Sequence, residues 1–285
     1  MTAGMETKRI FTEEQVITDE QVEQLLADAL ELYGYDFTDY SKASVKRRIN
    51  RLFAVDRFPS FAELRYRLRN DKEYVNRFVE SISVNVTEMF RDPAFYQALR
   101  TQVLPQLATY PYIRIWHAGC ATGEEVYSMA IVLKEMNLLH KSLLYATDIS
   151  QEALERARQG IVPLNNMKLY SENYIQSGGT RTFSDYYSAT YDRAKLNDDL
   201  KKKMVFAMHN LVSDGSFNEF QLILCRNVLI YFNKQLQDRV IRLFSNSLDK
   251  LGFLALGTKE TLRFTDVAKH FKQVDGKEKI WRKII

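Results

Sequence analysis

The stretch "IWHAGCATGEEVYS" at residues 115–128 gives the clearest indication of the fold of this chain. It begins as an apolar strand, breaks at Gly119 and Gly123, and continues with the apolar spacing of a helix. A strand, a glycine-containing turn and a helix in this order are typical of the first unit of an open α/β sheet, whose turn approaches a ligand closely. The turn differs from a phosphate-binding loop, because no lysine follows Gly123 and two acids, Glu124 and Glu125, come instead.

Strand-like and helix-like runs alternate from residue 112 to the end of the chain. This alternation predicts a mostly parallel sheet covered by helices on both faces. The last two strands are separated by only a short stretch, which predicts an antiparallel edge. The expected strands are residues 112–119, 142–148, 204–210, 220–227, 253–258 and 279–285, and the expected helices are 124–137, 151–160 and 234–251, the last capped by Asn233 and ended by Gly252.

Residues 161–203 fit this alternation poorly, so we expect an inserted subdomain there. Within it, "SGG" at residues 177–179 suits either a helix C-cap or a hairpin turn. The sequence does not decide between these two structures.

The chain has helical periodicity before residue 112, which predicts a separate N-terminal domain. Its first helix would be capped by Asp19 and ended by Gly34. The expected division is a small helical bundle at 10–80, a linker and cofactor-covering segment at 81–111, and an α/β domain at 112–285 with the insertion at 161–203.

Composition narrows the class of protein further. A net charge of +4 over 285 residues does not indicate a general nucleic-acid binder. The sequence has no apolar run long enough to cross a bilayer and no signal peptide at its start, so we expect a cytoplasmic protein and a monomer. Cys120 and Cys225 end apolar runs and are expected to be buried thiols. The four histidines are scattered, so we expect no metal.

The residues that end the strands are the candidates for ligand binding, because ligands bind at the carboxyl ends of parallel strands. Asp148 ends the second strand, where a carboxylate can accept two hydrogen bonds from a ribose diol. Asn210 and Asn227 each offer a donor and an acceptor, which suits an adenine edge or an amino-acid head group. Taken singly, Asp148 is also a common helix-entry acid before Ser150, and the asparagines are also ordinary turn residues.

The acids after the turn indicate the charge of the ligand. A pyrophosphate would be repelled by Glu124 and Glu125, whereas an ammonium or a sulfonium would be attracted. The turn therefore favours S-adenosylmethionine over a nicotinamide dinucleotide. Acids in the first turn of a helix also stabilise the helix dipole, which is sufficient to explain Glu124.

Five motifs together resemble the chemoreceptor glutamate O-methyltransferases, the CheR family. They are "SVNVTEMFRD" (83–92), "GCATGEEVYSMA" (119–130), "YATDIS" (145–150), "HNL" (209–211) and "LCRNVLIYF" (224–232). The resemblance implies a Rossmann-like class I methyltransferase domain, with a mostly parallel sheet and an antiparallel edge, preceded by a small all-α domain. It also implies that S-adenosylmethionine is the methyl donor, S-adenosylhomocysteine the product, and receptor glutamates in bacterial chemotaxis the acceptors.

The resemblance also implies roles for single residues. Glu125 would hold the methionyl ammonium and Asp148 the ribose, while Arg91 would orient the substrate glutamate and Tyr231 would line the methyl site. For Arg91 the alternative is an ion pair with Asp92 or another neighbour. The implied cofactor contacts are Asn85, Thr87, Arg91, Glu125, Asp148, Asn210, Leu211, Asn227 and Val228.

Two features depart from the family pattern. The glycine loop lacks the proline that follows the acids in many relatives. The segment 161–203 does not match, in its sequence, the short three-stranded insertion that binds a receptor tail peptide in some members. Methyl transfer is still expected, whereas the sequence does not decide whether a receptor tail peptide binds.

A basic helix near residues 41–57 is the candidate surface for docking the acceptor. Because receptor methylation regions are rich in glutamate, a basic face would complement them. The alternatives are a solvated helix face and an inter-domain salt bridge to residues 1–40, which hold ten acids and two bases. The candidate docking residues are Lys42, Lys46, Arg47, Arg48 and Arg51.

Three other functions remain open from the sequence alone. A methyltransferase fold can serve as a non-catalytic, cofactor-binding regulator, or can act on a different protein carboxylate. A nicotinamide-dependent oxidoreductase would need a third glycine near the helix start, where Val126 and Tyr127 lie instead.

Overall fold

The computed structural model describes residues 16–83 and 86–285. Contacts divide the chain into two compact units. One comprises Met1–Thr38 and Lys42–Ile82, and the other comprises Asp39–Ser41 and Ser83–Ile285. In the part of the chain that the structure describes, no helix is both long enough and apolar enough to cross a membrane.

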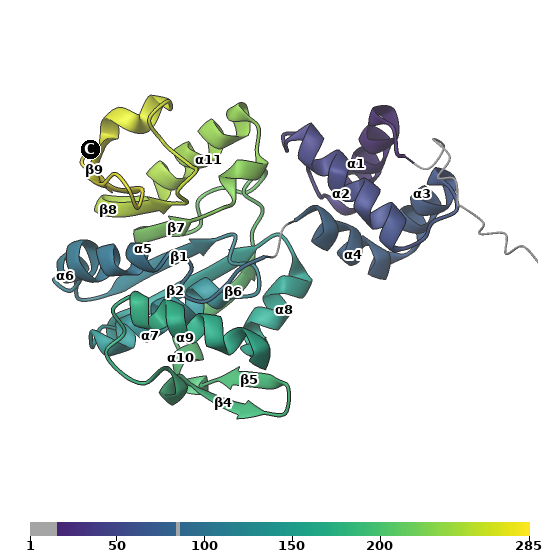
Figure 1. The fold of residues 1–285 in the computed structure, drawn as a ribbon. Coiled ribbons are helices and arrows are strands. Elements are labelled where there is room, and N and C mark those ends of the chain that lie inside the picture. Colours follow the sequence, from purple (N-terminus) through teal and green to yellow (C-terminus); the bar gives the residue numbers. More distant parts are fainter. Residues whose placement is uncertain (1–15, 84–85) are drawn as a thin grey trace, which may run out of the picture. The chain divides into compact units, whose positions relative to one another are not determined.

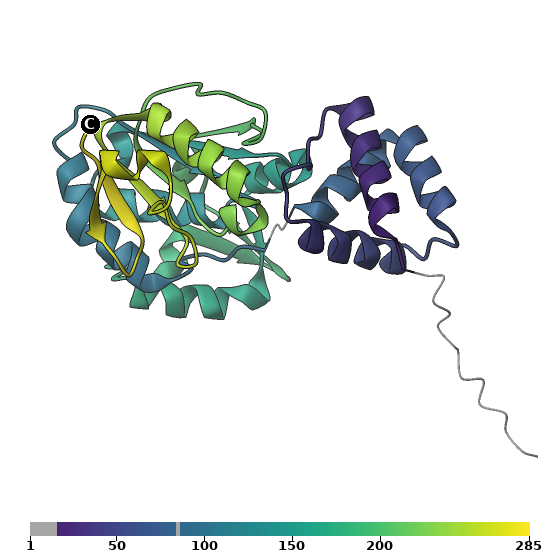
Figure 2. The same cartoon turned by 90° about the horizontal axis from the view of Figure 1, so that it is seen from above.

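The N-terminal unit is a four-helix bundle, drawn from purple to blue in Figure 2. Its first helix is capped by Thr18 in a capping box with Gln21, so the expected cap at Asp19 was one residue too late. The helix ends at Gly34 in the left-handed conformation, as predicted. Each helix buries one apolar stripe against the others. The helices are α1 (Asp19–Tyr33), α2 (Lys42–Val55), α3 (Phe61–Asn70) and α4 (Lys72–Ile82).

The C-terminal unit contains a seven-stranded sheet in the order β6-β2-β1-β7-β8-β10-β9. The strands from β6 to β8 are parallel, and β10 runs antiparallel to both β8 and β9. The predicted mixed sheet is therefore confirmed. The strands are β1 (Ile113–Ala118), β2 (Ser142–Asp148), β6 (Met204–Met208), β7 (Phe220–Cys225), β8 (Leu248–Leu256), β9 (Phe271–Asp275) and β10 (Ile280–Lys283).

The central strands are apolar on both faces because helices cover both. Successive side chains of β1 point to opposite faces of the sheet. Ile115 packs in the buried cluster that includes residues of α7. Trp116 packs on the other face, against Phe244 of α11, and also contacts Phe220 of β7. Figure 1 shows α7 and α11 on opposite sides of the sheet. The helices are α5 (Pro93–Ala98), α6 (Leu104–Leu107), α7 (Glu124–Glu135), α8 (Gln151–Gln159), α9 (Met167–Gln176), α10 (Asp198–Lys201) and α11 (Lys234–Ser247).

The end of α11 differs from the prediction. Asn233 caps this helix, as expected, because its side chain accepts a hydrogen bond from the Leu236 N–H. The helix stops at Ser247, however, and not at Gly252. The residues from Leu248 onward extend β8 instead, since Leu248 pairs with Phe220 of β7. Pairing in the sheet therefore overrides the helical character of "LDKL".

The insertion contains a three-stranded antiparallel sheet in the order β3-β5-β4, so the expected departure from a three-stranded insertion was wrong. Residues 177–179 follow the end of α9, with Gly178 at φ 81°, and form a helix end and not a hairpin turn. A Cβ at Gly179 would lie 2.3 Å from the Tyr174 ring, which explains the second glycine. The strands are β3 (Ile161–Pro163), β4 (Tyr187–Thr190) and β5 (Arg193–Leu196).

The insertion is anchored to the last residue of α7, Glu135. The side chain of Glu135 is 1% exposed and forms an ion pair with Arg100. It also accepts hydrogen bonds from the hydroxyls of Tyr174 and Tyr186 and from the Thr180 N–H, the last at 3.1 Å. A buried carboxylate with this many partners fixes the insertion against the sheet domain.

Candidate active site

The loop after β1 lies directly against the loop after β7. Gly119 has φ 78°, and its N–H donates to the carbonyl oxygen of Thr147 at 2.8 Å. A Cβ on Gly119 would lie 2.5 Å from Cγ2 of Val228. Glycine is thus required both by the backbone conformation and by the neighbouring valine. This contact brings together two of the predicted ligand-binding loops at the carboxyl ends of β1 and β7.

Asp148 connects the glycine loop to the end of β2. Its Oδ2 accepts the Ala121 N–H and its Oδ1 accepts the Ser150 N–H, both at 2.9 Å. Burial raises the pKa of Asp148, and these backbone donors offset only part of the increase. Ser150 also caps α8, so the helix-entry role of Asp148 is real. Each oxygen has a second lone pair, which leaves the carboxylate able to accept hydroxyl groups as well.

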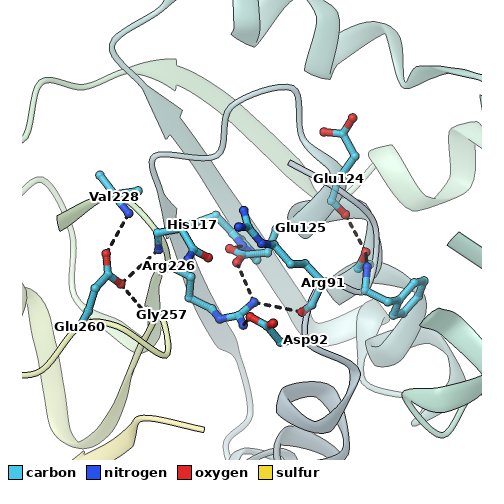
Figure 3. Close-up of polar contacts among 12 residues, drawn as sticks. Arg91, Asp92, His117, Glu124, Glu125, Arg226, Val228, Gly257 and Glu260 are labelled. Atoms are coloured by element: carbon cyan, nitrogen blue, oxygen red, sulfur yellow. Dashed lines mark hydrogen bonds and ion pairs between the residues drawn. The ribbon is translucent and has the colours of Figure 1, made fainter. Parts of the chain in front are cut away.

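Glu125 lies in the first turn of α7 and is held from two sides. Its Oε1 is 2.9 Å from Nδ1 of the fully buried His117, and its Oε2 is 3.6 Å from Nη1 of Arg226. Burial raises the pKa of Glu125, but His117 and Arg226 outweigh this effect and hold it below the usual range. Glu125 is therefore ionised at neutral pH. Glu124 points elsewhere, as Figure 3 shows, and accepts a hydrogen bond from the Thr122 hydroxyl at 2.7 Å.

Arg226 follows β7 and contacts the segment at residues 81–111, which the sequence motifs predicted to cover the cofactor. Its Nη2 is 2.7 Å from Oδ2 of Asp92, and its guanidinium lies 3.9 Å from the ring centroid of Phe95. Asp92 therefore pairs with Arg226, whereas the expected alternative was a pair with Arg91. The Nη1 of Arg91 lies 3.4 Å from the carbonyl oxygen of Val86.

The covering segment has an unusual backbone. Phe90 and Asp92 both adopt positive φ, at 53° and 57°, although neither is glycine. The Phe90 N–H donates to the buried hydroxyl of Ser128 on α7 at 2.9 Å, which holds this conformation in place. Such conformations cost about 1–3 kcal/mol each and cluster at functional sites.

Glu260 was not predicted, yet it shapes the loop that carries Asn227 and Val228. Its buried carboxylate accepts hydrogen bonds from the N–H groups of Asn227, Val228 and Ile230 at 3.1, 2.9 and 3.3 Å, and from that of Gly257. Figure 3 shows the contacts with Val228 and Gly257. Burial raises the pKa of Glu260, while these donors lower it in part. Asn227 itself has φ 62°. Only the tertiary structure reveals this role, because Glu260 is distant in sequence from the loop.

Two of the remaining predicted cofactor residues, Asn210 and Leu211, come just after β6. The His209 N–H donates to the Asp148 carbonyl at 3.2 Å, which brings the residues after β6 to the end of β2. Asn210 makes a local turn, since its Oδ1 accepts the Val212 N–H at 3.0 Å. Leu211 is buried, while Thr87 and Tyr231 are half-buried. Asn85 lies outside the described residues.

The five candidate docking bases lie on α2 of the N-terminal unit, and they differ in their partners. Lys42 pairs with Glu23 at 2.9 Å, and Lys46 pairs with Asp19 at 2.8 Å. Arg48 donates to the carbonyl oxygen of Ile82. Two of the five bases thus pair with acids of residues 1–40, but within one unit and not between domains as that alternative supposed, while Arg47 and Arg51 are exposed.

Three buried polar atoms near Glu125 have no hydrogen-bond partner within the described chain. They are the Tyr96 hydroxyl, Nε2 of His117 and Nε of Arg226. Buried polar atoms without a hydrogen-bond partner are uncommon in folded proteins, and here they indicate a site that can bind a polar ligand. Within residues 16–83 and 86–285, no cluster of three or more His, Cys, Asp or Glu side chains has the arrangement of a metal site.

Together, the sheet order, the glycine loop after β1 and the acid that ends β2 define a Rossmann-like, S-adenosylmethionine-dependent methyltransferase. Two family descriptions match the chain: "CheR methyltransferase, SAM binding domain" over residues 85–280 and "CheR methyltransferase, all-alpha domain" over residues 20–83. The chain belongs to the CheR methyltransferase family. It is accordingly an S-adenosylmethionine-dependent protein-glutamate methyltransferase, and the family acts on chemoreceptors.

Individual relatives agree with this assignment. The chain is 46% identical over 263 residues to a Pseudomonas putida protein whose name contains "methyltransferase Cher3", with 91% of this chain and 96% of that protein covered. It is 30% identical over 262 residues to a "Chemotaxis protein methyltransferase" of Borreliella burgdorferi, covering 87% and 90% of the two chains. A protein of the same name from Listeria innocua is 30% identical over 232 residues, with 80% and 85% covered.

Proposed function

We propose that the residues at the carboxyl ends of β1, β2, β6 and β7 bind S-adenosylmethionine and present it to glutamate side chains on chemoreceptor cytoplasmic helices. The protein would act in the cytoplasm, as a monomer. The observation that carries this proposal is the ionised carboxylate of Glu125, which stands among unpartnered polar atoms beside the glycine loop. A cationic amino-acid head group suits this environment better than a phosphate does.

The polar groups at this edge of the sheet suit each part of S-adenosylmethionine in turn. Glu125 would hold the ammonium, and Asp148 would accept the ribose hydroxyls. Asn210 and Leu211 would line the adenine, and Asn227 and Val228 would lie near the methyl donor. Thr87, Arg91 and the undescribed Asn85 would complete the contacts from the covering segment.

Bound S-adenosylmethionine supplies a methyl group that is activated by the adjacent sulfonium. The acceptor carboxylate of glutamate is already ionised at neutral pH, so the chain has no need to supply a general base. Its residues would instead bind, orient and exclude water. Arg91 would orient the acceptor carboxylate by paired hydrogen bonds, and Tyr231 would line the methyl site.

Docking of the acceptor would use the basic face of α2. Arg47 and Arg51 are the exposed candidates, whereas Lys42, Lys46 and Arg48 also bind groups of their own unit. We expect the double variant Arg47→Glu with Arg51→Glu to raise the KM for the acceptor about tenfold and to leave affinity for S-adenosylhomocysteine unchanged. Equal loss of both would contradict a docking role.

Two measurements test the whole proposal. Calorimetry should detect binding of S-adenosylhomocysteine and no binding of NAD. Transfer of a labelled methyl group should then occur to a purified cytoplasmic fragment of a methyl-accepting chemoreceptor. Binding of S-adenosylhomocysteine without transfer would favour a different acceptor or a non-catalytic regulator, and binding of NAD alone would refute the cofactor.

A further inference from the structure

Arg226 is a buried cation between two acids that it does not contact equally. Its side chain is 3% exposed. The Nη2–Oδ2 distance to Asp92 is 2.7 Å, whereas the Nη1–Oε2 distance to Glu125 is 3.6 Å. Figure 3 shows the guanidinium between these two carboxylates. Arg226 therefore makes its strong pair with the acid that has no proposed contact with the cofactor.

We propose that Arg226 is a positioning residue that Asp92 holds away from Glu125, so that Glu125 stays available to the ammonium of the cofactor. The same pair fixes the backbone of Arg91, since Nη1 of Arg226 lies 3.4 Å from the Arg91 carbonyl oxygen. The inference rests on the proposed roles of Glu125 and Arg91. It adds Asp92 and Arg226, which touch neither the cofactor nor the acceptor in that proposal.

Charge accounting supports this arrangement. One guanidinium faces the carboxylates of Asp92 and Glu125, and the buried Glu278 also interacts with Arg226 electrostatically, so Arg226 cannot balance the charge of all these acids. An ammonium at Glu125 would supply a further positive charge. Without the charge of Asp92, Arg226 would be the natural partner of Glu125, and the two would already be neutral together. The ammonium would then have to displace a buried guanidinium, which weakens binding.

The packing of Arg226 keeps it in this intermediate position. Its guanidinium carbon lies over the ring of Phe95 at 3.9 Å from the centroid, and Phe95 belongs to α5, the helix that begins directly after Asp92. The left-handed backbone of Asp92 directs its carboxylate without making a side-chain cap for α5. The side chain of Asp92 thus does not cap the helix, and its carboxylate accepts a hydrogen bond from Arg226 instead. The strained backbone is consistent with a positioning role.

The decisive experiment is the substitution Asp92→Asn. Asparagine keeps the size of the side chain and tolerates positive φ well, so the variant should fold. We expect calorimetry to show about tenfold weaker binding of S-adenosylhomocysteine, although Asp92 is not a cofactor contact. We also expect a lower kcat for methyl transfer, because the backbone of Arg91 is less fixed. The matched control is Asp266→Asn, which breaks the exposed pair with Arg242 and should change neither value.

A second background separates positioning from a general loss of structure. In Arg226→Met the competing cation is absent, so adding Asp92→Asn should change the affinity less than twofold. Unchanged affinity in Asp92→Asn would refute the inference, as would an equal loss in both backgrounds. If Arg226→Met does not fold, the single variant and its control still decide. Failure of the wild-type protein to bind S-adenosylhomocysteine would instead refute the proposed site itself.

Discussion

The two ends of α7 each carry a glutamate beside an arginine, and the two acids differ in how many hydrogen-bond partners they have. Glu135, at the C-terminal end, accepts from Arg100, two tyrosine hydroxyls and a backbone N–H. Glu125, at the N-terminal end, has His117 at 2.9 Å and Arg226 only at 3.6 Å. Unpartnered polar atoms surround Glu125 as well.

This difference separates a structural acid from a binding acid. In both cases burial raises the pKa of the carboxyl group and the partners lower it by more, so both are ionised. A carboxylate whose partners are complete holds the fold together, and another ligand would have to displace one of them. A carboxylate with incomplete partners keeps capacity for a ligand. Four predictions test this distinction, from the largest expected effect to the smallest.

The largest effect should follow from Glu135→Ala. This change leaves Arg100 buried without its acid and releases Tyr174 and Tyr186, so we expect the free energy of unfolding to fall by about 3–5 kcal/mol. Urea denaturation measures it. The control is Arg242→Ala at an exposed pair, which should cost less than about 1 kcal/mol. Equal costs for the two variants would show that Glu135 is not a structural hub.

Glu125→Gln should have the opposite profile. The amide keeps the shape of the side chain but loses the charge, so binding of S-adenosylhomocysteine should weaken by about 2–3 kcal/mol. The free energy of unfolding should change by less than about 1 kcal/mol. Calorimetry and urea denaturation on the same preparation give both numbers. A large loss of stability with unchanged affinity would reverse the assignment of the two acids.

Glu260→Gln should fall between these two. Its carboxylate accepts hydrogen bonds from four backbone N–H groups through two oxygens. Glutamine has only one acceptor oxygen, so its NH2 group would face some of these N–H donors without forming a hydrogen bond. We expect about 1–2 kcal/mol of lost stability and a several-fold weaker affinity for S-adenosylhomocysteine. Wild-type affinity in this variant would mean that the loop from Asn227 to Ile230 does not need Glu260 for its binding conformation.

The smallest effect is expected in the pH dependence of stability. The pKa of Glu135 is lower in the folded state than its unfolded value of about 4.3, so the unfolded chain binds more protons in acid. The stabilisation from Glu135 is therefore present above that value and is lost as the pH falls through the folded pKa. Denaturation between neutral pH and about pH 3 should show a shallower decline for Glu135→Gln than for the wild type. Parallel curves would contradict this.

The sequence was sufficient for the parts of the fold that local periodicity specifies. The strands that end at Ala118 and Asp148 and the helix caps at Ser150 and Asn233 lie where apolar runs and capping residues predicted them. The three-stranded sheet was missed because its strands, such as "IVP" and "YSAT", are too short and too mixed in polarity to show alternation. Likewise, the end of α11 depends on a strand pairing that local propensity cannot reveal.

For the site, the sequence could indicate which residues end the strands but not what holds them. Glu125 and Asp148 were found because their position after a strand and their charge are both local properties. Some of the groups that hold the site come from distant parts of the chain: Arg226, just after β7, reaches Glu125, and Glu260 reaches Asn227 from a later loop. A single sequence carries no signal for such tertiary pairs.

The close contact of Gly119 with Val228 has a consequence for how this fold can diverge. The two residues lie more than a hundred positions apart, yet each limits the volume the other can occupy. Substitutions at Gly119 and at Val228 are therefore coupled. Homologues that keep glycine at the position of Gly119 should rarely carry a side chain bulkier than valine at the position of Val228. The loop is therefore better described by the pair of Gly119 and Val228 than by its glycines alone.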